Sequence, residues 1–74
     1  DADPDVKDKI ADELIVKLNH TPVEKNLLAI MIVKALGRLG HPKALVHLIA
    51  VTQKGYLRVV KEEAKKSIEM LQNF

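Results

Sequence analysis

Apolar residues recur in this chain at an interval of 32 positions, and this recurrence limits the folds that the chain can adopt. Leu28, Ile32, Ala35, Leu36 and Leu39 fall on Val60, Ala64, Ser67, Ile68 and Leu71 after that shift. A shift of 31 positions likewise places Leu14 on Leu45 and Leu18 on Ile49. Repeated units of this length bury their apolar faces against one another. The pattern therefore predicts two copies of one helix–turn–helix unit.

The composition favours helices and a single small domain. The chain has 74 residues, with no cysteine, no tryptophan, one phenylalanine and one tyrosine. A core of this size yields only about 3–5 kcal/mol of net stability, and without cysteine no disulfide can reinforce it. Aliphatic residues and lysine dominate, as is typical of packed helices. We predict one all-α domain over residues 1–74, built from two stacked antiparallel helical hairpins.

Capping signals set the predicted limits of the first hairpin, residues 3–39. Asp3 and Pro4 are suited to the start of a helix, which the apolar spacing extends to His20. Thr21-Pro22-Val23-Glu24 matches a capping box, so the second helix is predicted to begin there and to end at Leu39.

The second hairpin is predicted over residues 42–72. Gly40 can end the second helix in the left-handed conformation, and Pro42 can begin the third. The third helix is predicted over residues 42–53, with Gly55 as its stop, and the fourth over residues 56–72.

Two segments resemble HEAT-like repeats of the short class found among relatives of phycobilin lyases. They are the stretch ALGRLGHPKAL at residues 35–45, and Val60-Lys61 followed by Ala64 and Ser67-Ile68. His41, Ala29 and Lys61 depart from the Asp and Arg residues usual at those places, so the buried Asp–Arg ladder of long arrays should be missing. The resemblance implies partner binding on the stacked helices and brings no catalytic residues.

Two candidate surfaces follow from the predicted helices. Basic residues of helices two and four are the candidate partner-binding residues: Lys34, Arg38, Arg58, Lys61 and Lys65. A second apolar stripe of helix four is the candidate self-association surface: Tyr56, Val59, Met70 and Phe74. Fewer than about three stacked units are usually marginal in stability. We therefore expect a protein–protein interaction or scaffolding module that self-associates or joins a larger repeat array.

A small basic nucleic-acid-binding domain is the alternative from another class. Residues 1–13 carry six acids against two lysines, and the remainder carries ten bases against four acids. The lysines and arginines of helices two and four could contact phosphates. Glu62 and Glu69 interrupt that surface, however, and no aromatic pair is available to stack on bases.

Neither catalysis nor a cofactor is predicted. His20, His41 and His47 lack the spacing of a zinc site, and loop or capping roles explain the first two. Solvation explains the acids Asp8, Asp12 and Glu13 better than a bound cation does. Ser67 has no histidine placed to act as its base, so we assign it to helix packing. An accessory lyase-like domain would need a cysteine or an aromatic pocket, which the sequence lacks.

No membrane span is predicted, because the longest apolar run, residues 27–33, is far shorter than the roughly 20 residues that cross a bilayer. The chain begins at Asp1 without a basic and apolar leader, which suggests a processed or excised segment. We expect it in the cytoplasm.

Overall fold

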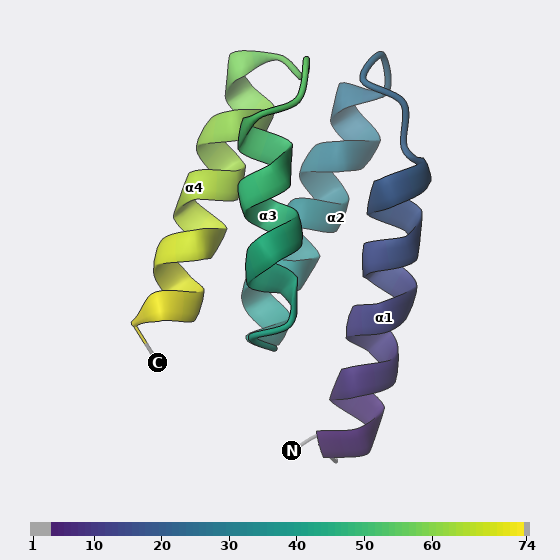
Figure 1. Ribbon diagram of the computed structural model, residues 1–74, viewed down its shortest axis with the longest axis vertical. Helices are drawn as coiled ribbons and strands as arrows, with labels where there is room; N and C mark the ends of the chain where they lie inside the picture. The colour runs from purple at the N-terminus through teal and green to yellow at the C-terminus, as the bar shows by residue number, and fades with distance from the viewer. Residues whose placement is uncertain (1–3, 74) are drawn as a thin grey trace.

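The computed structural model describes residues 4–73, and within them it contains four α-helices and no strand (Figure 1). The helices are α1 (Pro4–His20), α2 (Asn26–Leu39), α3 (Ala44–Thr52) and α4 (Arg58–Gln72). The prediction of an all-α fold is confirmed. The proposed capping role of Asp3 lies outside the described residues.

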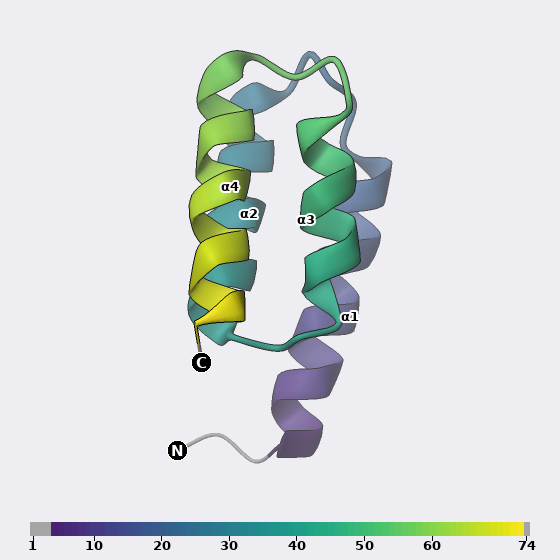
Figure 2. The same ribbon diagram turned by 60° about the vertical axis from the view of Figure 1, so that its left-hand side comes forward.

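Two antiparallel hairpins, α1–α2 and α3–α4, pack side by side (Figures 1 and 2). The most extensive helix–helix contact joins α2 to α4, and α1 touches α3 only slightly. Helices two and four are the segments related by the 32-residue shift, and they pack against each other. The stacked arrangement predicted from that shift is confirmed.

The first connection differs from the prediction, because α2 begins at Asn26 and not at Thr21. The Thr21 hydroxyl donates a hydrogen bond to the carbonyl oxygen of Lys17 at 2.6 Å, so it satisfies the last turn of α1 instead of capping α2. The Lys25 amide bonds the Pro22 carbonyl at 3.0 Å and closes a turn. The predicted capping box is therefore wrong, because the threonine side chain bonds to α1 and not to the start of α2.

The connection between α2 and α3 follows the prediction more closely. Gly40 has a φ of 75°, and its amide donates to the Leu36 carbonyl, so it ends α2 in the left-handed conformation. The regular helix α3 begins at Ala44, two residues after Pro42. His41 supports this corner with its ring, since Nδ1 accepts a hydrogen bond from the Lys43 amide at 3.2 Å.

The core lies between the two hairpins and draws on all four helices. Its largest fully buried side chains are Leu18, Val33, Leu36, Leu48, Val51 and Val60. All of them are aliphatic, as the composition predicts, and residues of both hairpins contribute to one continuous cluster. Burial of this apolar surface is the main force that holds the hairpins together.

Tyr56 joins the core at the connection between α3 and α4, where its side chain is only 4% exposed. Its hydroxyl donates a hydrogen bond of 2.8 Å to the Thr21 carbonyl in the first hairpin. Nearby, the Leu57 amide donates to Asn26 Oδ1 at 2.9 Å. These two bonds connect the ends of the hairpins at which α2 and α4 begin.

Candidate functional site

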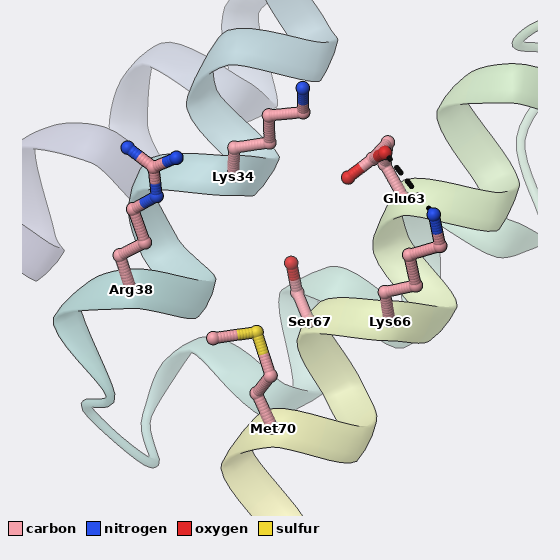
Figure 3. Close-up of a pocket in the computed structure, with 6 residues that line it drawn as sticks. All are labelled: Lys34, Arg38, Glu63, Lys66, Ser67 and Met70. Atoms are coloured by element: carbon pink, nitrogen blue, oxygen red, sulfur yellow. Dashed lines mark ion pairs between the residues drawn. The ribbon is translucent and has the colours of Figure 1, made fainter.

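A groove of about 170 Å³ runs between α2 and α4 (Figure 3). Its walls carry long polar and flexible side chains from both helices, and a serine lies at its floor. The residues that line it are Lys34, Arg38, Glu63, Lys66, Ser67 and Met70.

The floor of the groove is the closest approach of the two helices. Ser67 is 3% exposed, and its hydroxyl donates a hydrogen bond to the Val33 carbonyl at 3.1 Å. It lies directly against Gly37: a Cβ atom added there would come within 2.5 Å of Ser67 Oγ and 2.9 Å of Ser67 Cβ. The assignment of Ser67 to helix packing is confirmed.

The groove carries three cations and one carboxylate. Lys34 and Arg38 extend from α2 and face Glu63 and Lys66 of α4 across the gap (Figure 3). Glu63 Oε1 and Lys66 Nζ form an ion pair at 3.8 Å, which is a long contact between partly solvated groups. The groove therefore has an excess of positive charge, and an anionic group could enter it without displacing a short ion pair.

Of the five predicted partner-binding residues, only Lys34 and Arg38 line this groove. At about 100° per residue, Arg58, Lys61 and Lys65 lie well away from Ser67 around α4. Arg58 instead pairs with Glu62 at 3.0 Å, and Lys61 is partly buried. The five cations do not form one surface.

Two groove residues, Glu63 and Lys66, were absent from the predicted set. Lys66 is the equivalent of Lys34 after the 32-residue shift, so the repeat itself was the signal that could have identified it. Glu63 is the equivalent of Met31, which carries no charge, so the repeat gives no signal for Glu63.

The predicted self-association stripe on α4 is partly wrong. Tyr56 was placed on it by helical spacing, but the helix begins two residues later, and the tyrosine turns into the core. Val59 and Met70 are exposed, at 50% and 46%. Phe74 lies outside the described residues. Met70 lines the groove, so this residue of the stripe belongs to the same surface as Lys34 and Arg38.

A second apolar surface lies on α2, on the side turned away from α4. Leu28 is 43% exposed there, and Ala35 and Leu39 on the same side are partly buried. We call these three residues the α2 edge. The edge is about 120° around the helix from Lys34, so it does not belong to the groove.

Acidic residues of α1 hold the corner between α2 and α3. Lys43 Nζ contacts Asp8 at 2.6 Å and Asp12 at 2.8 Å, and His41 Nε2 lies 3.1 Å from Asp8. The hydrogen bond from Lys43 lowers the pKa of Asp8 below its usual value. Asp8 and Asp12 are solvent-exposed, at 45% and 60%, as expected, and both also pair with this lysine, which the sequence did not predict.

The other candidate sites bring together fewer residues from different helices. A hollow of about 370 Å³ borders α1, but the described residues that line it all come from that helix: Asp12, Glu13, Val16 and Lys17. Within residues 4–73 no three His, Asp or Glu side chains gather in a way that could hold a metal ion. In the same part of the chain, every buried side-chain nitrogen and oxygen has a hydrogen-bond partner.

No helix in the described residues has the length and apolar character needed to cross a membrane. Comparison with models of protein families, with curated proteins and with solved structures found no match.

Proposed function

We propose that this chain is a non-catalytic protein–protein interaction module of HEAT-like type, and that its α2 edge packs against another helical hairpin. The observation that carries the proposal is a difference in burial between equivalent residues of the two hairpins. In α4, Val60 and Ser67 are covered by α2 and are at most 3% exposed. Their equivalents in α2 are less covered, since Leu28 is 43% exposed and Ala35 is only partly buried.

The uncovered residues have the character of a packing surface. Leu28 is a large aliphatic side chain at the position where Val60 is buried, and Ala35 is small at the position where Ser67 allows close approach. A hairpin placed on α2 as α2 is placed on α4 would cover both. Large exposed apolar groups that share one face of a protein commonly mark an interaction site.

The partner expected at this edge is a second copy of the chain, or a neighbouring repeat in a longer protein. In a solution of the isolated chain, only a second copy can cover the edge. A nucleic-acid partner is disfavoured, because Arg58, Lys61 and Lys65 lie away from the groove that holds Lys34 and Arg38. Phosphate contacts along one strand require cations on one surface.

Sedimentation velocity over a concentration series tests the proposal. The native chain should form dimers or larger species at high micromolar concentration, and Leu28→Glu should remain a monomer because it places a charge in the apolar contact. Circular dichroism must show that the variant keeps its helices. Leu28 is 43% exposed, so the substitution leaves no large cavity.

Val46→Glu is the matched control, since Val46 is 70% exposed and lies on α3. This variant should associate as the native chain does. A native chain that stays monomeric at high micromolar concentration would contradict the proposal, as would equal loss of association in the two variants.

A further inference from the structure

Two matched ridges, one on α2 and one on α4, contain five of the six described residues that line the groove, together with Leu27, Met31 and Val59. On α2 the ridge consists of residues at spacings of four, three and four: Leu27, Met31, Lys34 and Arg38. This spacing keeps all four on one side of a helix, and all four are exposed. The ridge on α4 consists of their equivalents after the 32-residue shift: Val59, Glu63, Lys66 and Met70.

The chemical character of the ridges changes along the groove. At the end where both helices begin, the exposed groups are apolar: Leu27 is 74% exposed, Met31 61% and Val59 50%. Toward the other end the ridges become basic, with Lys34 and Arg38 opposite Lys66 (Figure 3). The two ridges together thus offer a mainly apolar half, in which Glu63 is the equivalent of Met31, and a mainly basic half, in which Met70 is the equivalent of Arg38.

We infer that this groove binds an acidic amphipathic helix of a partner protein. The apolar side chains of that helix would pack on Leu27, Met31 and Val59, and its carboxylates would meet Lys34, Arg38 and Lys66. Charge complementarity selects the partner, because among the described residues three cations line the groove against one carboxylate, that of Glu63.

A helix matches the groove in length and shape. The ridge from Leu27 to Arg38 spans twelve residues of α2, or about 16 Å along the helix axis. A partner helix of three turns has the same length, and apolar helix faces commonly dock into grooves between helices. The exposed Met31 and Met70 are flexible enough to adapt to the partner's side chains.

The inference rests on the proposed function only in that it takes the ligand to be part of a protein. The α2 edge and the groove are separate surfaces, so their tests fail separately. A monomeric chain that binds an acidic helix would contradict the stacking proposal alone. A self-associating chain that ignores such a helix would contradict the groove alone.

The test uses a fluorescein-labelled, acetylated helix-forming peptide with leucines in its first turns and glutamates in its last turns. Fluorescence anisotropy with the full chain should show saturable binding at low salt that weakens as salt is added. A peptide with lysines in place of the glutamates should bind at least roughly tenfold more weakly, because opposite charges become like charges.

Two double variants with the same change in net charge locate the site. Lys34→Glu with Arg38→Glu should weaken binding by roughly tenfold. Arg58→Glu with Lys65→Glu should leave it within about twofold, since neither residue lines the groove. Circular dichroism of both variants checks that the helices remain.

A second pair of variants tests the apolar half. Leu27→Gln should weaken binding several-fold, because it removes an apolar contact without disturbing the core. Val46→Gln is the control at a similarly exposed position on α3 and should have no effect.

Absence of peptide binding at low salt would overturn the inference. So would equal weakening by the two double variants, which would indicate a response to net charge alone. Displacement of the peptide by duplex DNA at lower concentration than by unlabelled peptide would instead identify the groove as a phosphate-binding surface.

Discussion

At the scale of single residues, the contact of Gly37 with Ser67 sets the distance between the two hairpins. The serine hydroxyl bonds the Val33 carbonyl, and its Cβ and Oγ occupy the space that any side chain at position 37 would need. A larger residue at either position would push α2 and α4 apart. The groove lies over this contact, so its width depends on the same two residues.

Gly37→Ala should destabilise the chain. Overpacking costs about 1–3 kcal/mol, and the roughly 1 kcal/mol gained when alanine replaces glycine inside a helix compensates for only part of that cost. Urea unfolding followed by circular dichroism measures the change. Gly55→Ala is the control: an added Cβ there meets nothing within 4 Å, so its effect should be within about 0.5 kcal/mol.

Ser67→Gly provides the second arm of this experiment. Without the serine side chain, the alanine at position 37 loses the two atoms that it would strike. The cost of Gly37→Ala should therefore be smaller in the Ser67→Gly chain than in the native chain. An equal cost in both would contradict the close contact.

Asp8 makes the stability of the folded chain depend on pH. The hydrogen bond from Lys43 lowers its pKa in the folded chain relative to about 3.9 in the unfolded chain. The resulting stabilisation is present above pH ~4 and is lost as the pH falls through the folded pKa of Asp8. Lys43→Met should raise the Asp8 pKa, as carboxyl NMR titration can measure. An unchanged Asp8 pKa in this variant would show that Lys43 does not control it.

At the scale of elements, the connections were harder to predict than the helices. The limits of α1 and the left-handed Gly40 follow from local signals that act on their own helix ends. Thr21 and Tyr56 were misassigned because each satisfies a group that local spacing does not reveal. The threonine bonds back to Lys17, and the tyrosine reaches Thr21 in the other hairpin. A long-range partner of this kind leaves no periodic pattern in the sequence.

Burial raises the pKa of the Tyr56 phenol above its usual value of 10. The folded chain therefore resists ionisation of this phenol. The contribution of the neutral phenol to folding stability is present below pH ~10 and is lost as the pH rises toward the folded pKa. Tyr56 is the sole tyrosine, so an ultraviolet absorbance titration reports on it alone. The midpoint should be higher in the native chain than in urea, and equal midpoints would contradict the burial.

Tyr56→Phe separates the hydroxyl from the ring. The ring can still fill the core, but the Thr21 carbonyl loses its hydrogen bond. We expect a loss of about 0.5–1.5 kcal/mol in urea unfolding. A loss of several kcal/mol would mean that the ring itself had moved.

At the scale of the whole molecule, the 32-residue recurrence predicted which helices pack together, since α2 and α4 form the largest contact. The same recurrence also points to Lys66 as a groove residue, because Lys66 is the equivalent of Lys34. It did not predict which cations share a surface. Helical rotation places Lys61 and Lys65 away from Ser67, and this depends on where α4 packs against α2.

The duplication also leaves the molecule asymmetric. Val60 and Ser67 of α4 are buried, whereas their equivalents Leu28 and Ala35 on the α2 edge are more exposed. The proposed packing of the α2 edge against another hairpin would bury these residues as their equivalents in α4 are buried.

Photo-crosslinking from position 28 tests whether the α2 edge packs on a second copy of the chain. A photoreactive phenylalanine at Leu28 should link two chains on illumination at high micromolar concentration, and the same group at Val46 should link far fewer. Mass spectrometry would place the links on a helical hairpin of the second copy. Only intramolecular products from position 28, with linked dimers from position 46, would contradict the account.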